Sequence, residues 1–499
     1  MQGMDVKDIV IVGGGTAGWM SAAGMSKLLG SKKINIRIIE SESIGTVGVG
    51  EATVPHIQYF NRLLGIDENS FIKKTNATFK LGIEFVDWHK IGESYFHSFG
   101  PYGLDMEGIH FHHMWLRQQK MGTAKPIDEF NLQVQAAKAG KFMRARPELQ
   151  GSPLSALSYA YQFDAALYAA FLRDFSEKNG VTRTEGKIVK VTQATNTGHI
   201  ESVTLEDGEC IKGDLFIDCS GFKGLLIEET LKTGYEDWSH YLPCDSAVTR
   251  LSKRMTDLPP YTRATAKTAG WQWRIPLQSR TGNGYVYSSQ FLSDQDAIES
   301  LNKDLDTAPI SAPRQLRFKT GIRKQPWNKN VVSIGLASGF LEPLESTSIH
   351  LIQTAIARLM TNFPDKLFNQ ADIDFYNEST HKEYVQVRDL LILHYKATTR
   401  HDSPFWNYVR EMDIPVSLEK RIAIYKENAR LYSEDKEFFN HSSWFAIFNG
   451  QSIHPQRYHP IANFLDEKEM ERRMTEIHTV TQKCLSIMPS HEEFLAKQL

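Results

Sequence analysis

A lysine in an alternating segment is the first residue of this chain whose chemistry depends on where its side chain points. Residues 79–85, FKLGIEF, place apolar side chains on one face of a predicted strand and Lys80 on the other. On most strands such a lysine faces solvent. If Lys80 instead points into an enclosed channel, burial favours the neutral, nucleophilic amine. The periodicity leaves both interpretations open.

A second group of candidate residues precedes a predicted helix. Within residues 341–360, apolar residues recur at helical spacing, and Pro343 indicates where the helix begins. The free backbone N–H groups of Thr347 and Ser348 would form an anion-sized site at this helix start. Glu345 would lie at the edge of that site, either as a functional carboxylate or as a side chain that complements the helix dipole.

Two pairs of aromatic side chains could contact a flat ligand. The segment WQWRIP, residues 271–276, places Trp271 and Trp273 on one side of an extended stretch. His97 and Phe99 share one face of another predicted strand and could form a slot for an aromatic ring. Core packing is the alternative explanation for both pairs.

A glycine-rich turn predicts nucleotide binding. An apolar strand leads into GGGTAG, residues 13–18, and a helix-compatible segment and a second strand ending at Glu40 follow. This order is the opening βαβ unit of a dinucleotide-binding fold. Gly13 permits the tight turn, Gly15 lets the backbone approach a pyrophosphate, and Gly18 lets the helix pack on the strand. The helix N-terminus would face the phosphates, and Glu40 would accept hydrogen bonds from the ribose.

Two later segments suggest that one domain is assembled from distant parts of the chain. Residues 213–222 and 331–343 each repeat the pattern of an apolar strand followed by small residues. The predicted nucleotide-binding module therefore spans residues 1–365 and is built from segments at about 1–55, 155–234 and 321–365. Two insertions, at about 56–154 and 235–320, interrupt it and are expected to form the substrate region. Residues 366–499 follow as a separate, mainly helical part.

The composition disfavours several classes of protein. The 499 residues carry 57 Lys and Arg against 59 Asp and Glu, so no net charge favours nucleic acid or an anionic membrane. No segment has the roughly 20 consecutive apolar residues of a transmembrane helix. The N-terminus leads directly into a core strand rather than a signal peptide, so a cytoplasmic location is expected. The four cysteines lack CxxC spacing and the 17 histidines lack an HExxH motif, so no metal site is expected.

Four motifs occur together and in order: GGGTAGW at 13–19, FKLG around Lys80, WQWRIP at 271–276 and LEPLEST at 341–347. In this combination the chain resembles the flavin-dependent tryptophan halogenase family over nearly its whole length. WxWxIP is the most specific motif, since ordinary flavin monooxygenases with a similar glycine motif lack it. The resemblance implies an α/β fold, with a Rossmann-like, flavin monooxygenase-like FAD-binding module, an inserted substrate region and a largely helical C-terminal part.

The resemblance also implies a reaction. A separate flavin reductase supplies FADH2, which together with O2 oxidises bromide or chloride to hypohalous acid. Lys80 then either forms a haloamine or polarises the oxidant through a hydrogen bond. Glu345 orients the electrophile and stabilises or deprotonates the cationic arene, with Ser346 in support. The substrate is a small aromatic molecule.

The residues that the resemblance assigns fall into four groups. They are Gly13, Gly15, Thr16, Ala17, Gly18, Glu40, Val49, Gly50, Glu51, Ala52 and Leu336 for FAD; Thr347 and Ser348 for the halide; His97, Phe99, Pro101, Trp444 and Phe445 for the substrate; and Trp271 and Trp273 as the partition between flavin and substrate.

Two departures from the family pattern concern the substrate. Ser348 stands where tryptophan-specific members usually have glycine. Residues 441–451, HSSWFAIFNGQ, lack the tyrosine pair and the glutamate that grip the amino-acid group of tryptophan. The expected substrate is therefore an indole or another electron-rich arene rather than free tryptophan. A homodimer is left open.

Two other functions stay open at this point. A flavin-dependent aromatic monooxygenase shares the glycine motif but needs no distant lysine, so it would remain active without Lys80. A non-catalytic flavin-binding protein, or one related to tRNA modification, would bind flavin without halide-dependent turnover. The balanced charge gives no sign of the basic face that tRNA would need.

Overall fold

The computed structural model describes residues 4–30, 34–42, 50–432 and 437–498. The chain divides into two compact units: unit 1 comprises Met1–Ala77, Phe163–His240 and Arg317–Val385, and unit 2 comprises Thr78–Gln162, Tyr241–Leu316 and Gln386–Leu499. Residues 56–77, which the sequence analysis assigns to an insertion, and 366–385, which it assigns to the C-terminal part, lie in unit 1.

Unit 1 contains the predicted dinucleotide-binding fold. Its main sheet has the strand order β20-β21-β12-β1-β2-β8. At the centre, β1 (Asp8–Val12) runs parallel to β2 (Asn35–Glu40) and to β12 (Leu215–Asp218). The glycine turn after β1 leads directly into α1 (Thr16–Leu29), which packs against α6 and α8. The predicted α/β class is confirmed, and the carboxyl ends of the parallel strands share one edge of the sheet.

The other regular elements of unit 1 complete this sheet, form smaller sheets or are helices. They are helices α2 (Ile57–Leu64), α3 (Glu68–Lys74), α6 (Ala165–Lys178) and α8 (Ser348–Thr361), and strands β3 (Gly50–Ala52), β8 (Thr182–Glu185), β9 (Ile188–Gln193), β10 (Ile200–Leu205), β11 (Cys210–Lys212), β13 (Tyr235–Asp237), β19 (Gly321–Arg323), β20 (Trp327–Asn328), β21 (Val331–Ser333) and β22 (Gly339–Phe340).

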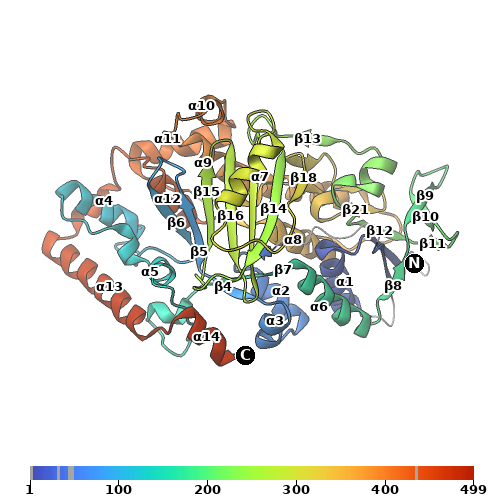
Figure 1. Cartoon of the computed structure of the whole chain (residues 1–499), viewed down its shortest axis with the longest axis horizontal. Helices are drawn as coiled ribbons and strands as arrows, with labels where there is room; N and C mark the ends of the chain where they lie inside the picture. Colours follow the sequence, from blue (N-terminus) through green and yellow to red (C-terminus); the bar gives the residue numbers. More distant parts are fainter. Residues whose placement is uncertain (1–3, 31–33, 43–49, 433–436, 499) are drawn as a thin grey trace. The chain divides into compact units, whose positions relative to one another are not determined.

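Unit 2 is built on a second sheet, with the order β18-β14-β17-β16-β15-β5-β6. In Figure 1 the yellow-green strands β14, β15 and β16 run side by side, and α7 packs on β14 and β17. The elements are β4 (Thr78–Lys80), β5 (Gly82–Val86), β6 (Ser94–Ser98), β14 (Ser246–Lys253), β15 (Thr262–Lys267), β16 (Gly270–Pro276), β17 (Arg280–Tyr287), β18 (Arg314–Arg317), α4 (Phe111–Met121), α5 (Leu132–Lys138) and α7 (Asp294–Lys303).

The C-terminal part is largely helical, as predicted. Helix α9 (Gln370–Lys396) begins in unit 1 and ends in unit 2, and β7 (Ala160–Asp164) likewise crosses the boundary. None of the described helices is both long and apolar enough to cross a membrane. The remaining helices are α10 (Pro404–Glu411), α11 (Val416–Asn428), α12 (His441–Gly450), α13 (Glu467–Ile487) and α14 (His491–Gln498).

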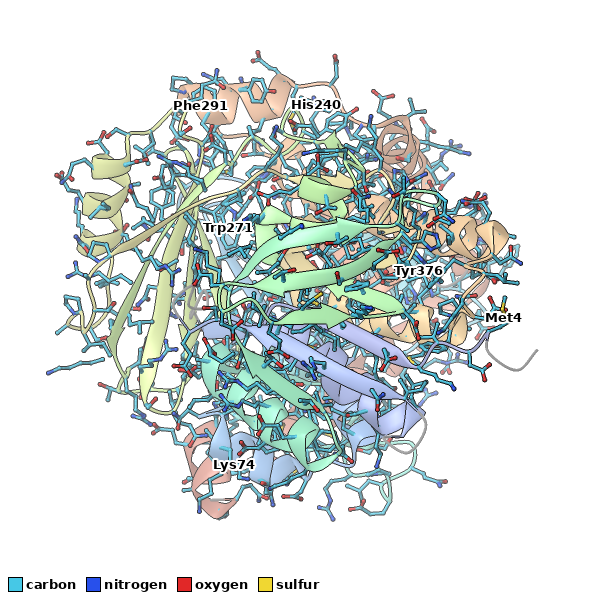
Figure 2. The ribbon with its side chains drawn as sticks, turned by 90° about the vertical axis from the view of Figure 1, so that its right-hand side faces the viewer. Met4, Lys74, His240, Trp271, Phe291 and Tyr376 are labelled. Atoms are coloured by element: carbon cyan, nitrogen blue, oxygen red, sulfur yellow. The ribbon has the colours of Figure 1, made fainter. Side chains whose placement is uncertain are left out.

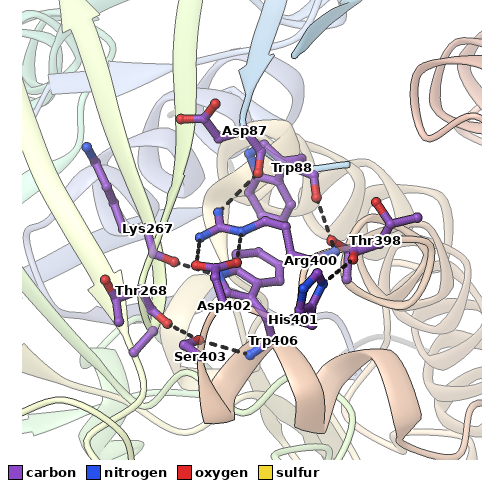
Figure 3. A network of polar contacts seen from close by, with 12 residues as sticks. Asp87, Trp88, Lys267, Thr268, Thr398, Arg400, His401, Asp402, Ser403 and Trp406 are labelled. Atoms are coloured by element: carbon purple, nitrogen blue, oxygen red, sulfur yellow. Dashed lines mark hydrogen bonds and ion pairs between the residues drawn. The ribbon is translucent and has the colours of Figure 1, made fainter. Parts of the chain in front are cut away.

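A buried arginine fixes the segment between α9 and α10 (Figure 3). The Arg400 side chain is 5% exposed and donates hydrogen bonds to both carboxylate oxygens of Asp402, at 2.8 and 2.7 Å. It also donates to the carbonyl of Asp87 at 3.0 Å. Nearby, Nε1 of Trp406 donates to the carbonyl of Lys267 at 2.7 Å. Arg400 therefore attaches this segment to the residue that follows β5, and Trp406 attaches the start of α10 to the end of β15.

We expect Arg400→Ala to lower the free energy of unfolding by about 2 kcal/mol or more, because it removes three hydrogen bonds that a buried guanidinium donates, two to Asp402 and one to the Asp87 carbonyl. The control is Arg457→Ala, which breaks an exposed pair with Glu427 (71% and 55% exposed) and should change the free energy by less than about 0.5 kcal/mol. Denaturant unfolding followed by tryptophan fluorescence measures both. Equal effects of the two substitutions would contradict the role given to Arg400.

Candidate active site

The glycine turn after β1 leaves open the space that a nucleotide needs. Gly13 has a φ of +110°, and a Cβ there would lie 2.3 Å from the carbonyl oxygen of Cys219. A Cβ on Gly18 would lie 1.8 Å from the carbonyl oxygen of Gly13, so α1 packs tightly on the turn. A Cβ on Gly15 would meet no atom within 4 Å. The backbone at Gly15 is therefore the part of the turn that a phosphate can approach.

The N-terminus of α1 supplies the matching electrostatics. Gly15 is the N-cap residue, and in the described structure no side chain caps this helix end. The first N–H groups of a helix lack intrahelical acceptors, and the helix dipole favours an anion there. Thr16 and Ala17, the first residues of α1, are half-buried beside this position. The turn and the helix end together fit the pyrophosphate of a dinucleotide such as FAD.

Glu40, at the end of β2, has partners that sequence reasoning missed. Its carboxylate accepts a hydrogen bond from Nε1 of Trp19 at 3.2 Å and a second one from Arg183. A Cβ on Gly14 would lie 1.6 Å from Oε2 of Glu40, so the carboxylate lies directly over the glycine turn. Since a carboxylate has about four acceptor positions, Glu40 retains the capacity to bind ribose hydroxyls.

Strand ends that are far apart in the sequence meet at this turn. Cys219, which follows β12, faces Gly13. Gly335, which follows β21, approaches Ala17 so closely that a Cβ on it would lie 2.7 Å from the Cβ of Ala17. Leu336, the next residue, is half-buried beside this contact. The three glycine-rich segments that the sequence singled out therefore form one site in unit 1.

Another predicted flavin segment is β3, which contains Gly50, Glu51 and Ala52. Gly50 and Ala52 are buried. Burial raises the pKa of Glu51 to about 7, so near neutral pH this carboxyl is partly protonated and can donate a hydrogen bond. Val49 lies outside the described residues.

The predicted anion site lies at the start of α8. Glu345 and Thr347 are 2% and 1% exposed, and Ser348, the first residue of the helix, is half-buried. Ser346 adopts a left-handed conformation with φ of 59°, which is uncommon for a residue other than glycine and fixes the direction of the turn. Within the described residues, Oγ1 of Thr347 is buried without a hydrogen-bond partner. This helix end therefore offers free backbone N–H groups and a free hydroxyl to an anion.

A buried polar cluster behind this turn carried no sequence signal. Nε2 of His350, in the first turn of α8, lies 3.3 Å from Glu383 of α9. Burial opposes ionisation of Glu383, but hydrogen bonds from His350 and Arg358 hold its pKa below the usual value. The ring of His56 packs edge-on against His350 at 4.9 Å, and burial and repulsion by His350 lower the pKa of His56 to about 4. The cluster ties α8 to α9 and to the residue that precedes α2.

In unit 2, Lys80 ends strand β4 and is fully buried, at 0% exposure. The interpretation of Lys80 as a solvated strand lysine is therefore excluded. Its Nζ lies 5.3 Å from the centre of the Phe99 ring. Lys80 is the partner of Ala160 in the antiparallel pair of β4 and β7. The structure thus places a buried amine beside an aromatic ring, and an enclosed channel at Lys80 stays a prediction.

A histidine from the C-terminal helix fixes this strand. The N–H of Phe79 donates to Nε2 of His491 at 3.1 Å, and Nδ1 of His491 donates to the carbonyl of Leu258 at 2.7 Å. Burial lowers the pKa of His491 to about 4, so the ring is neutral and one nitrogen can accept while the other donates. Nothing in the sequence linked His491 to Lys80, because 411 residues separate them.

The end of β6 and the turn that follows it hold the predicted substrate residues. His97 is 4% exposed, Phe99 is half-buried, and Pro101 is exposed. Nδ2 of Asn131 donates to Oγ of Ser98 at 2.8 Å and to the carbonyl of Gly100 at 3.0 Å. Oδ1 of Asn131 caps α5 by accepting from the N–H of Val134 at 3.0 Å. Asn131, which sequence reasoning missed, therefore joins α5 to the turn that presents His97 and Phe99.

The two indoles of the WxWxIP motif lie next to each other on β16. Trp271, labelled in Figure 2, is 2% exposed, and its ring centre lies 6.1 Å from that of Trp273. A Cβ on Gly284 of the neighbouring strand would lie 2.1 Å from the ring of Trp273, so Trp273 lies flat against β17. In the described part of the chain, the buried Nε1 of Trp273 has no hydrogen-bond partner.

Trp444 and Phe445 of α12 are each 1% exposed and are surrounded by protein. Nε1 of Trp444 donates to Glu437 at 3.0 Å, and the Arg421 guanidinium lies 4.0 Å from its ring centre. The ring of Phe445 stacks on His112 at 4.9 Å. These contacts are typical of core packing, and substrate contact by either residue stays a prediction.

The predicted residues thus separate by role between the two units. Unit 1 contains the nucleotide turn and the anion site with Glu345, whereas unit 2 contains Lys80, the aromatic residues around the β6 turn and the two indoles. Unit 1 presents a glycine turn and two helix N-termini that no described side chain caps, and unit 2 presents a buried amine beside an aromatic ring.

Comparisons with known proteins give this arrangement a context. A family model described as "Tryptophan halogenase" matches residues 8–467. The chain is 33% identical to tryptophan 7-halogenase RebH of Lentzea aerocolonigenes, over 99% of each chain. Among solved structures it is similar to Xcc4156, a flavin-dependent halogenase from Xanthomonas campestris, with 44% identity and a TM-score of 0.95 over 99% of this chain and 98% of that one. BrvH, a flavin-dependent halogenase from Brevundimonas sp. BAL3, shows 42% identity and a TM-score of 0.95 over 99% of each chain.

The open space at Gly15 makes a prediction about FAD binding. Gly15→Ser should leave the melting temperature of the FAD-free chain unchanged, because serine suits an N-cap and its side chain meets no protein atom. The same side chain occupies the space of the pyrophosphate, so the Kd for FAD should rise about tenfold or more. Fluorescence titration with FAD measures the affinity.

The matched variant is Gly18→Ala, which places a Cβ against the Gly13 carbonyl and should lower the melting temperature. If Gly15→Ser binds FAD as tightly as the unmodified chain does, the turn is not the pyrophosphate site.

Proposed function

Because this chain belongs to the tryptophan halogenase family, whose members are flavin-dependent halogenases, we propose that it halogenates an electron-rich aromatic compound such as an indole by way of Lys80. The observation that carries this proposal is the complete burial of the Lys80 amine beside the ring of Phe99. Flavin-dependent halogenases generally act on aromatic substrates and need a separate flavin reductase, and we expect both of this chain.

The residues of the nucleotide turn fit FAD. The backbone at Gly15 and the N-terminus of α1 would hold the pyrophosphate, Glu40 would accept from the ribose, and β3 and Leu336 would border the flavin. Bound as FADH2, the cofactor with O2 and a proton supplies the oxidation of a halide ion to hypohalous acid, leaving FAD and water.

The halide would bind at the start of α8. The backbone N–H groups of Thr347 and Ser348, the positive end of the helix and the unpartnered hydroxyl of Thr347 favour an anion there. Ser346, in its left-handed conformation, holds Glu345 and Thr347 on either side of one sharp turn.

Lys80 would act on the oxidant rather than on the flavin. In one route the amine attacks the halogen of hypohalous acid, forming an N–halogen bond and releasing water. In the other route the ammonium donates a hydrogen bond to the oxygen of hypohalous acid and so polarises the O–halogen bond. Either way the arene carbon receives the halogen and loses a proton, and Glu345 is the carboxylate that would stabilise the cationic arene or accept that proton.

The aromatic residues of unit 2 would hold the substrate. His97 and Phe99 provide flat surfaces on the turn that Asn131 fixes, and Pro101 borders them. Trp271 and Trp273 would form the partition between flavin and substrate. We propose an indole or a related arene rather than free tryptophan, since residues 441–451 lack the family's amino-acid clamp.

The family match supports a halogenase over the flavin-dependent hydroxylase that the sequence left open. A hydroxylase transfers oxygen to a ring beside the flavin and has no use for a buried lysine in another unit of the chain.

We expect Lys80→Met to abolish halogenation, because methionine keeps the length and apolar stem of the buried side chain but has no amine. FAD binding should stay unchanged, since the nucleotide turn lies in unit 1. The assay supplies FAD, a flavin reductase, O2, bromide and catalase with indole and other electron-rich arenes, and mass spectrometry detects the bromine isotope doublet. The control is Lys90→Ala, which changes an exposed lysine and should keep full activity.

Two results of this assay would overturn the proposal. A product that gains one oxygen atom would identify a hydroxylase. Undiminished bromination by Lys80→Met would show that the lysine is not needed.

We expect Thr347→Val to raise the KM for bromide about tenfold or more while the KM for the arene stays unchanged. The substitution keeps the shape of the side chain but removes a hydroxyl that would donate to the anion, and a hydrogen bond to a charged group contributes about 1.5–3 kcal/mol. Steady-state kinetics at varied bromide measures this. Thr361→Val, at the other end of α8, is the control, because the hydroxyl of Thr361 donates to the Ala357 carbonyl. An unchanged KM for bromide in Thr347→Val would remove the hydroxyl from the halide site.

A further inference from the structure

Three side chains of metal-binding type meet at one place in unit 2. Asp105 precedes α4, His110 is the N-cap residue of α4, and His441 is the first residue of α12. One ligand atom from each of the three residues lies within 4.8 Å of the other two. The sequence predicts no metal site, because its cysteines and histidines form no ligand motif at short spacing, whereas 331 residues separate His110 from His441.

The space between these side chains has the size of one ion. A cavity of about 10 Å³ is lined by the three residues together with Tyr102, His112 and Phe445. Such a volume accommodates a single water molecule or metal ion. His112 is not part of the group of ligand atoms that lie within 4.8 Å of one another, and its Nε2 donates to the carbonyl of Ala429 at 2.9 Å.

The Asp105–His110 pair has nearly the spacing of two ligands on one ion. Oδ2 of Asp105 lies 2.9 Å from Nδ1 of His110, and Oδ1 of Asp105 accepts from the backbone N–H of Phe111 at 3.0 Å. Ligand atoms at about 2.0–2.1 Å from a tetrahedral zinc ion lie about 3.3 Å apart. A metal ion can therefore replace the proton that this pair shares, while the Phe111 N–H holds the carboxylate in place.

His441 supplies the third ligand after a small rotation. Its ring is stacked on that of His110, with ring centres 3.8 Å apart and planes at 13°. A metal lies in the plane of each imidazole that binds it, so two parallel stacked rings cannot share an ion. Rotation of the half-buried His441 ring out of the stack directs a nitrogen to the ion.

We propose that Asp105, His110 and His441 form a binding site for a divalent transition-metal ion of the zinc type, with water as the fourth ligand. Two imidazoles and one carboxylate suit Zn²⁺, Ni²⁺ or Cu²⁺, whereas Mg²⁺ and Ca²⁺ prefer oxygen ligands alone. The bound ion joins the N-terminus of α4 to that of α12. It also orders the surroundings of Phe445, whose ring packs on His112 at 4.9 Å and on Tyr102 at 5.3 Å. The site does not depend on the halogenation proposal, since no residue of the reaction scheme belongs to it.

Isothermal titration of the full chain, without a polyhistidine tag, with ZnCl2 tests the site. We expect one Zn²⁺ per chain and a melting temperature that rises with Zn²⁺ but not with MgCl2. His441→Gln and Asp105→Asn should each raise the Kd for Zn²⁺ about tenfold or more and remove the rise in melting temperature. The matched control is His454→Ala, which removes an exposed histidine of the same unit and should bind Zn²⁺ as the unmodified chain does.

Melting curves without metal show whether each variant is folded. Because His441→Gln keeps a side chain of similar length, a folded variant that no longer binds Zn²⁺ has lost a ligand and not its fold. The proposal is overturned if the unmodified chain shows no saturable binding of one Zn²⁺. It is overturned equally if folded His441→Gln binds Zn²⁺ with unchanged affinity, or if Mg²⁺ competes for the site.

Discussion

The close approach of three backbone segments at the carboxyl ends of β1, β2 and β12 is the constraint on which unit 1 depends. The N–H of Gly13 donates to the carbonyl of Ile39 at 2.8 Å, and the N–H of Cys219 donates to the carbonyl of Val12 at 2.8 Å. A side chain at Gly13 would collide with Cys219, and α1 could then no longer begin where its N-terminus faces open space. The proposed flavin site is therefore shaped by the packing of small residues more than by large side chains.

Two polar side chains of the proposed reaction are buried. Lys80 and Thr347 are 0% and 1% exposed, and burying polar groups away from water costs free energy unless they form hydrogen bonds. Within the described residues, Oγ1 of Thr347 has no hydrogen-bond partner. A halide ion at the proposed site at the start of α8 would supply that partner.

Residues outside every recognisable motif position these groups. Asn131 fixes the turn of His97 and Phe99, His491 holds the strand of Lys80, and the pair of His350 and Glu383 supports the first turn of α8. Each acts through one or two hydrogen bonds from an element remote in the sequence. The Asp105, His110 and His441 cluster has the same character, since its ligands come from separate helix ends.

By itself, the sequence determined the βαβ opening, the strand of Lys80, the helix start after Glu345 and the family, because glycine spacing and apolar periodicity are local properties of the chain. The sequence left the exposure of Lys80 undetermined, since alternating apolar and polar residues show that a strand has two different faces but not whether the polar face is buried. Tertiary structure decided it, by packing β4 between β7 and His491. It also decided the partners of Glu40 and the positions of Asn131, His350 and His441, because contacts across tens to hundreds of residues depend on how the chain folds back and leave no local pattern.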